Sequence, residues 1–153
     1  MSSDPTVLGY LGRALSLEFS AVQQFLSTAR LLDTRGIDVA AKRFHQEATE
    51  EMGHVERLIN RMLALGVAPN TSQLRPVRLN GSLPELVLNA LEFEREITAF
   101  YEGAVAHCLA VQEHDSRVFF EQLLQEERHH LVEFETWYGE LTANAVRSRE
   151  AKR

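Results

Sequence analysis

Cysteine, glycine, proline and long apolar runs are all scarce in this chain of 153 residues. Its single cysteine, Cys108, excludes an internal disulfide and any site built from several thiolates. No apolar run approaches the roughly 18 residues needed to span a bilayer, and no secretion signal is visible near the first residue. We therefore expect one domain, residues 1–153, that works in the cytoplasm without a membrane partner.

Positive charge is also in the minority. The chain has 22 acidic against 16 basic residues, which gives a net charge of −6. This balance argues against nucleic acid as a partner and fits a protein that handles cations. No glycine-rich phosphate loop and no Ser/His/Asp arrangement occurs, so hydrolytic and nucleotide-dependent activities lack support.

The few glycines and prolines fall between long stretches with helical periodicity, and no stretch alternates like a strand. The pattern predicts an all-α protein, a four-helix bundle over about residues 4–141 with one long crossover connection at 67–83. Residues 142–153 are expected to form a short fifth helix or a frayed tail. The predicted helices cover residues 4–33, 37 or 38 to 65, 82–113, and 114–116 to 141.

Each predicted helix carries one glutamate near the middle of its apolar seam, where a hydrophobic residue belongs: Glu18, Glu51, Glu94 and Glu127. Buried carboxylates are costly and would repel one another, yet no Lys or Arg interrupts these seams. A pair of divalent cations would supply the missing charge. His54 and His130 each follow a glutamate by three residues and therefore share its helix face.

The six residues also obey one internal offset. A shift of 76 residues maps Glu18 onto Glu94, Glu51 onto Glu127 and His54 onto His130. The halves therefore resemble two copies of a helical hairpin, and we expect each to give one metal ion two carboxylates and a histidine. Such a ligand set suits iron or manganese, and the same pattern of glutamates and Glu-x-x-His pairs occurs in di-iron and di-manganese carboxylate proteins.

The chain resembles the bacterioferritins of the ferritin-like superfamily over about residues 7–141. The resemblance rests on Leu-Ser-Leu-Glu-Phe-Ser at 15–20, Glu-Glu-Met-Gly-His-Val-Glu at 50–56, Glu94, and Glu-Glu-Arg-His-His at 126–130. It implies a ferritin-like bundle that assembles from dimers into a 24-subunit cage, oxidises Fe(II) with dioxygen or hydrogen peroxide, and stores ferric mineral. It also implies two iron ions per subunit, with Glu51 and Glu127 bridging them. The implied catalytic and metal-binding residues are Glu18, Glu51, His54, Glu94, Glu127 and His130.

Met52 lies off the bundle seam, on a second apolar stripe with Ala48, Val55 and Ile59. A second apolar face indicates a subunit interface. The resemblance implies that Met52 is the axial ligand of a haem b shared between two subunits. The neighbouring Gly53 would leave room for a close partner.

Some positions depart from the family pattern. Phe25 stands where many members have a tyrosine near the iron site, and Tyr101, its counterpart under the offset, is a candidate replacement. Gln46 replaces a histidine that some members use for iron on the inner surface, whereas Glu47 and Glu50 remain as candidate ligands there. The short basic tail leaves the channel architecture open.

Two other functions stay open at this point. One is a non-storage di-iron or di-manganese oxidase or peroxidase that acts as a dimer. The other is a haem-binding or assembly subunit in a mixed cage with a second type of chain. The complete set of ligands argues against a purely passive subunit, so the storage ferroxidase is the favoured hypothesis.

Overall fold

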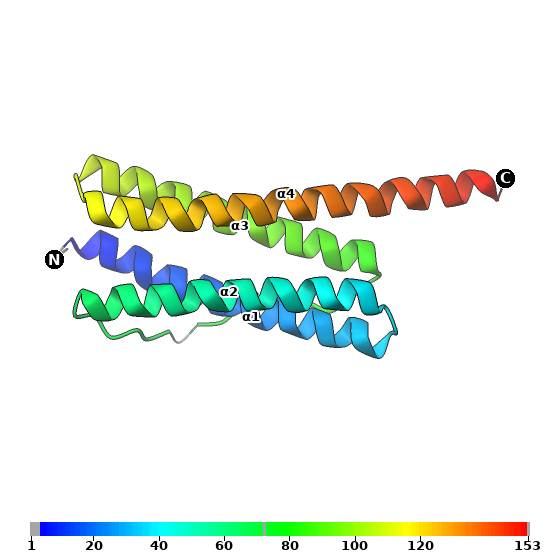
Figure 1. Cartoon of the computed structure of the whole chain (residues 1–153), viewed down its shortest axis with the longest axis horizontal. Coiled ribbons are helices and arrows are strands. Elements are labelled where there is room, and N and C mark those ends of the chain that lie inside the picture. Colours follow the sequence, from blue (N-terminus) through cyan, green and yellow to red (C-terminus); the bar gives the residue numbers. More distant parts are fainter. Residues whose placement is uncertain (1–3, 72, 153) are drawn as a thin grey trace.

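The computed structural model describes residues 4–71 and 73–152, and within these ranges it contains four helices and no strand. The helices are α1 (Pro5–Thr34), α2 (Asp38–Ala64), α3 (Leu83–Ala110) and α4 (His114–Ala151), arranged side by side as a bundle (Figure 1). The predicted all-α four-helix bundle with one long crossover is confirmed. The expected domain limits include residues 1–3, 72 and 153, which lie outside the described residues.

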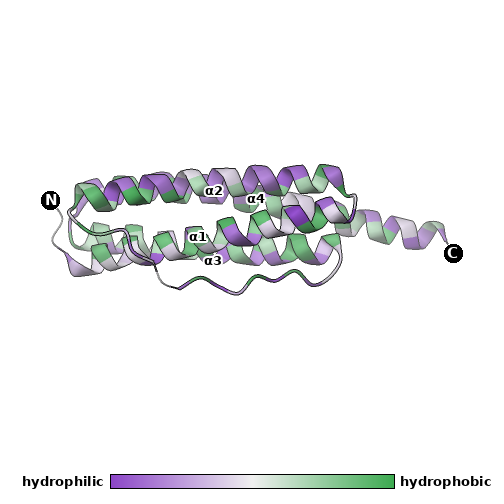
Figure 2. Cartoon of the chain, turned by 90° about the horizontal axis from the view of Figure 1, so that it is seen from below, coloured by the Kyte–Doolittle hydropathy of each residue, from purple (hydrophilic) through white to green (hydrophobic). Residues whose placement is uncertain are grey.

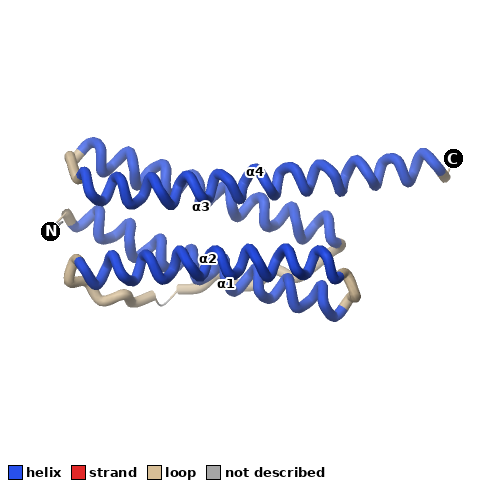
Figure 3. Tube along the Cα trace, viewed as in Figure 1, coloured by secondary structure: helices blue, strands red, loops and turns tan. Residues whose placement is uncertain are grey.

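The helices form two antiparallel hairpins, α1 with α2 and α3 with α4, which pack against each other (Figure 3). Asp4 caps the start of α1 by accepting a hydrogen bond of 2.9 Å from the backbone N–H of Thr6, and Pro5 occupies the first turn. Gly36 and Gly66 follow the ends of α1 and α2 with φ of 75° and 76°. This left-handed conformation lets the chain leave each helix sharply at a residue without a Cβ.

The C-terminal segment differs from the expectation of a separate fifth helix or frayed tail. α4 continues without a break to Ala151, well past the predicted end at Leu141, and its last turns project beyond the other helices (Figure 1). No glycine or proline follows Gly139, and the segment contains alanines and arginines, which favour helix. Nothing in the local sequence therefore stops the helix where its apolar seam ends.

The crossover between α2 and α3 runs the length of the bundle (Figure 2). It is fastened to a polar stripe on α1. The Gln24 amide donates to the backbone carbonyl of Arg78 at 2.7 Å and accepts from its N–H at 2.8 Å, and the Ser20 hydroxyl accepts from the N–H of Arg75 at 3.1 Å. These bonds satisfy backbone groups that a loop packed on a helix would otherwise leave unpaired.

Aromatic side chains fill the core on both sides of its middle level. Phe25, Phe44 and Phe134 pack together on one side, with ring centroids 5.6 to 6.1 Å apart. Tyr101 and Phe120 pack on the other side, with centroids 6.2 Å apart. The level between them is therefore closed to water along the bundle axis. None of the described helices is both long enough and apolar enough to cross a membrane.

The Gln24 anchor can be tested directly. Gln24→Ala removes both hydrogen bonds to Arg78 and is expected to lower the free energy of unfolding by about 1–3 kcal/mol, because two hydrogen bonds that hold the crossover to α1 are lost. Chemical denaturation of the variant and the wild type measures the difference. Gln23→Ala, at the exposed neighbouring position, is the control and should change the value little. Equal effects of the two substitutions would contradict this role.

Candidate metal centre

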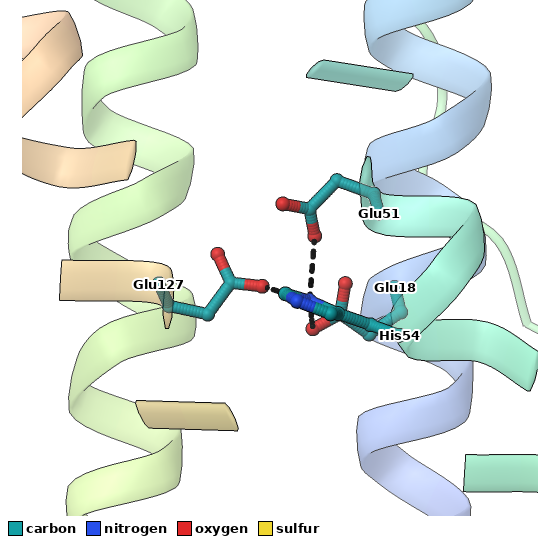
Figure 4. Close-up of side chains that lie close together, drawn as sticks. All are labelled: Glu18, Glu51, His54 and Glu127. Atoms are coloured by element: carbon teal, nitrogen blue, oxygen red, sulfur yellow. Dashed lines mark hydrogen bonds and ion pairs between the residues drawn. The ribbon is translucent and has the colours of Figure 1, made fainter. Parts of the chain in front are cut away.

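The four glutamates predicted from the apolar seams meet at the middle of the bundle, one from each helix. Glu18, Glu51, Glu94 and Glu127 are each 0% exposed, and His54 and His130 are each 4% exposed. Figure 4 shows Glu18, Glu51 and Glu127 directed at the ring of His54. The structure thus brings all six predicted side chains together.

The histidines reach across the two hairpins. Nδ1 of His54 on α2 lies 2.8 Å from Oε1 of Glu127 on α4, and Nδ1 of His130 on α4 lies 2.8 Å from Oε1 of Glu51 on α2. The two rings stack with centroids 5.9 Å apart and planes 10° from parallel. These contacts are images of each other under the 76-residue offset, so the internal repeat of the sequence is a repeat of the site as well.

The ligand atoms fall into two groups of four, each compact enough to surround one ion. One group is Glu18, Glu51, His54 and Glu127, and the other is Glu51, Glu94, Glu127 and His130. Glu51 and Glu127 belong to both. Each group contains the two glutamates and the histidine expected from one hairpin, and it adds one glutamate from the opposite hairpin.

The second ring nitrogen of each histidine points away from the glutamates toward another carboxylate. His130 Nε2 lies 2.6 Å from Oε2 of Glu50, and His54 Nε2 lies 3.6 Å from Oε2 of Glu126. Metal-binding histidines commonly donate their other N–H to such a carboxylate, which fixes the ring and leaves the inner nitrogen free to bind. Glu50 is within hydrogen-bond distance of His130 and orients its ring, whereas Glu126, its counterpart under the offset, lies too far from His54 to accept a hydrogen bond.

Raised pKa values favour protonation of some groups in the cluster, which offsets part of the negative charge of its glutamates. Burial, followed by the neighbouring carboxylates, raises the pKa of Glu51 and Glu94 well above the usual range of a glutamate. Burial also opposes a charge on the two histidines, but their glutamate partners outweigh it and raise the pKa of His54 to about 12 and that of His130 to about 9. Glu127 goes the other way: burial is outweighed by its contacts with Glu94 and both histidines, which hold its pKa well below the usual range.

The donor set fits divalent cations. Five buried oxygens of the four central glutamates have no hydrogen-bond partner among the described residues: Oε2 of Glu18, Oε2 of Glu51, both oxygens of Glu94 and Oε2 of Glu127. Buried acceptors left this way are costly, and an ion between them would satisfy several at once. Four carboxylates with one imidazole for each of two ions suit iron or manganese better than calcium, which prefers oxygen alone, or structural zinc, which prefers thiolates.

A third compact group adjoins the site. Glu47 and Glu50, the predicted inner-surface residues, meet His130, and Oε2 of Glu47 lies 3.5 Å from its Nδ1. Burial raises the pKa of Glu47 to about 8, with the charges of Glu50 and Glu133 adding to the effect. A groove of about 580 Å³ between α2 and α4 opens to the surface and is lined by Glu50 and both histidines.

Two further predicted positions lie as follows. The hydroxyl of Tyr101 is fully buried and donates a hydrogen bond of 2.8 Å to Oε1 of Glu18, whereas Phe25 lies among other aromatic rings. Met52 is on the outside of α2 and is 38% exposed. A Cβ added to Gly53 would meet no atom within 4 Å, so nothing within the described chain requires glycine at that helical position.

Comparison with known proteins places the chain in a family. A family model described as ferritin-like domain matches residues 8–143. A bacterioferritin of Brucella melitensis is 32% identical over 136 residues, which are 89% of this chain and 84% of the relative. A bacterioferritin of Streptomyces coelicolor is also 32% identical over 136 residues, which are 89% of this chain and 81% of the relative. A bacterial ferritin of Synechocystis is 32% identical over 117 residues, which are 76% of this chain and 75% of the relative. The chain belongs to the bacterioferritin branch of the ferritin-like superfamily.

The raised pKa values in the cluster predict that metal binding depends on pH. The pKa values of Glu51, Glu94 and both histidines are raised, so these groups hold protons more strongly than free side chains do, and a divalent cation must displace such protons to bind. Zn²⁺ binding should therefore release protons and weaken as the pH falls from 8 to 6. Isothermal titration calorimetry in buffers of different ionisation enthalpy counts the protons released. A heat that does not depend on the buffer would contradict this account of the site.

Proposed function

We propose that this chain is an iron-storage ferroxidase, which oxidises Fe(II) with dioxygen or hydrogen peroxide at the centre within each subunit and stores the ferric product in a 24-subunit cage. The observation that carries the proposal is the pair of four-ligand groups that share Glu51 and Glu127. The similarity to bacterioferritins over most of the chain supports the same conclusion.

In this proposal each residue of the cluster has one task. Glu51 and Glu127, which belong to both groups, bridge the two iron positions, while Glu18 with His54 and Glu94 with His130 complete one position each. Two Fe(II) ions held side by side together supply the two electrons that dioxygen or peroxide takes up. The protein contributes a fixed geometry, negative charge and a site closed to water on both sides by aromatic rings.

Access to the centre is proposed to run through the groove between α2 and α4, because it leads from the exterior to both histidines. Glu50 lines this groove, and Glu47 lies next to it at His130; together the two carboxylates would hold iron between the centre and the stored mineral. Their carboxylates suit both Fe(II) and Fe(III).

Met52 is proposed as the axial ligand of a haem b held between two copies of the chain. Its thioether is accessible on the outer face of α2, and Gly53 beside it leaves the surface open to a close neighbour. A haem between two equivalent methionines requires a two-fold dimer, the unit from which the proposed cage is built.

The ferroxidase assignment is tested by removing one ligand from each position. Glu18→Ala and Glu94→Ala should each lower the rate of Fe(II) oxidation by at least about 100-fold, because a two-electron step needs both ions together. Stopped-flow absorbance of the ferric product gives the rate. Glu92→Ala removes an exposed carboxylate from the same helix as Glu94 and should leave the rate unchanged. Fast oxidation by the Glu18 and Glu94 variants would refute the site assignment.

The haem assignment is tested with Met52→Leu, which keeps the volume and removes the sulfur. This variant should lose the haem Soret absorbance of the purified protein and keep its rate of Fe(II) oxidation. Met62→Leu, at a buried position of the same helix, should retain the haem. Equal haem content in the two variants would exclude Met52 as the ligand.

Light scattering after size-exclusion chromatography separates the proposed function from its alternatives. A mass of about 24 subunits that retains many irons per chain is expected of the storage cage. A dimer with two metal ions per chain and no mineral would instead indicate a non-storage oxidase. A large assembly that forms only with a second type of chain would indicate a mixed cage.

A further inference from the structure

The two halves of the centre are related by the 76-residue offset, yet their surroundings differ. The ligands and the carboxylates behind the histidines match pair by pair, as described above. The match fails at several other positions, and three of these carry side chains that differ in hydrogen bonding or charge: Phe25 corresponds to Tyr101, Glu47 to Leu123 and Arg57 to Glu133. These three differences fall unequally on the two metal positions.

The first difference concerns the terminal glutamates. Tyr101 is 1% exposed, and its hydroxyl donates a hydrogen bond of 2.8 Å to Oε1 of Glu18. Glu94 is the counterpart of Glu18, and neither of its oxygens accepts a hydrogen bond from a hydroxyl or N–H donor in the described chain. The Tyr101 hydroxyl therefore fixes one oxygen of Glu18, and the second oxygen has no hydrogen-bond partner. Glu94 has no such donor, and its nearest histidine nitrogen, Nδ1 of His130, lies 4.0 Å from its Oε1.

The other two differences concern charge outside the histidines. Behind His54, Arg57 forms an ion pair with Glu126 and neutralises it. Behind His130, the ion pairs of Glu47, Glu50 and Glu133 are with histidines, His130 for the first two and His129 for Glu133, and none of the three pairs with a Lys or Arg among the described residues. Glu50 and Glu133 are about half exposed, so solvent and salt screen their effect on a bound ion. Their charges therefore affect the rates at which cations bind and dissociate more than the affinity for a bound ion.

We propose that Tyr101 is a positioning residue that fixes Glu18, and that it makes the position of Glu18 and His54 the tighter of the two metal positions. The position of Glu94 and His130, whose glutamate accepts no hydrogen bond from a hydroxyl and which has acidic side chains outside it, exchanges its ion more readily. The inference rests on the proposed function, since it assigns unequal tasks to the two halves of that same centre. The physical reason is preorganisation: a ligand held in place by a hydrogen bond loses less freedom when an ion binds.

The experiment is a calorimetric titration with Zn²⁺, which is redox-inert and reports binding without turnover. The wild type should bind two ions per subunit in two distinguishable phases. Tyr101→Phe removes only the hydroxyl and should weaken the tighter phase by roughly 10- to 100-fold, while the weaker phase stays where it was. Tyr10→Phe removes the same atom from a half-buried tyrosine that makes no described hydrogen bond and should change neither phase.

Ligand variants assign the phases to their positions. Glu94→Ala should abolish the weaker phase and keep the tighter one, and Glu18→Ala should do the reverse. Two equal phases in the wild type, or a Tyr101→Phe variant whose phases are unchanged or equally weakened, would overturn the role of Tyr101 and leave the centre itself standing. A wild type that binds no Zn²⁺ would instead overturn the proposed function.

Discussion

Four carboxylates buried at one level of a helical bundle are the constraint on which the rest of this structure depends. Each loses its hydration in the core, and together they repel one another. His54 and His130 supply two positive charges at most, and several oxygens still lack a partner. In the proposed function a pair of divalent cations removes this deficit, so the residues that destabilise the bundle are the same residues that bind the ions. The buried carboxylates thus lower the stability of the bundle and provide its metal ligands.

The helices make that exchange possible because they hold the ligands in register. Each glutamate lies about two turns from a large aromatic residue on the same helix, as Glu18 does from Phe25 and Glu94 from Tyr101. These rings close the core on both sides of the carboxylates and exclude water, which strengthens the attraction between the cluster and a cation. The crossover fastened to α1 keeps the second hairpin antiparallel to the first, so that all four glutamates reach one level.

Much of this could be predicted from the sequence, because helical periodicity and spacing are local properties. A glutamate in an apolar seam and a histidine three residues later are visible in the chain without any tertiary information. What the sequence could not provide lies between elements: the reach of His54 to Glu127 across hairpins, the bond from Tyr101 to Glu18, and the seat of the crossover on Gln24. The predicted end of α4 near Leu141 is wrong for a different reason: the apolar seam stops there, but residues that favour a helix continue to Ala151.

If the centre works as proposed, the internal repeat lets one small domain hold two ions and bind them with different strength. The repeated helices fix the positions of the ligands. A single difference between the repeats, such as Tyr101 where the other half has Phe25, adds a hydrogen bond to one ligand without moving the helices. A centre that reacts with its ions and then passes the product on needs one position that retains an ion and one that releases it. Two equally tight positions would saturate, and two equally weak ones would seldom be filled together. Unequal halves on a repeated frame meet both requirements.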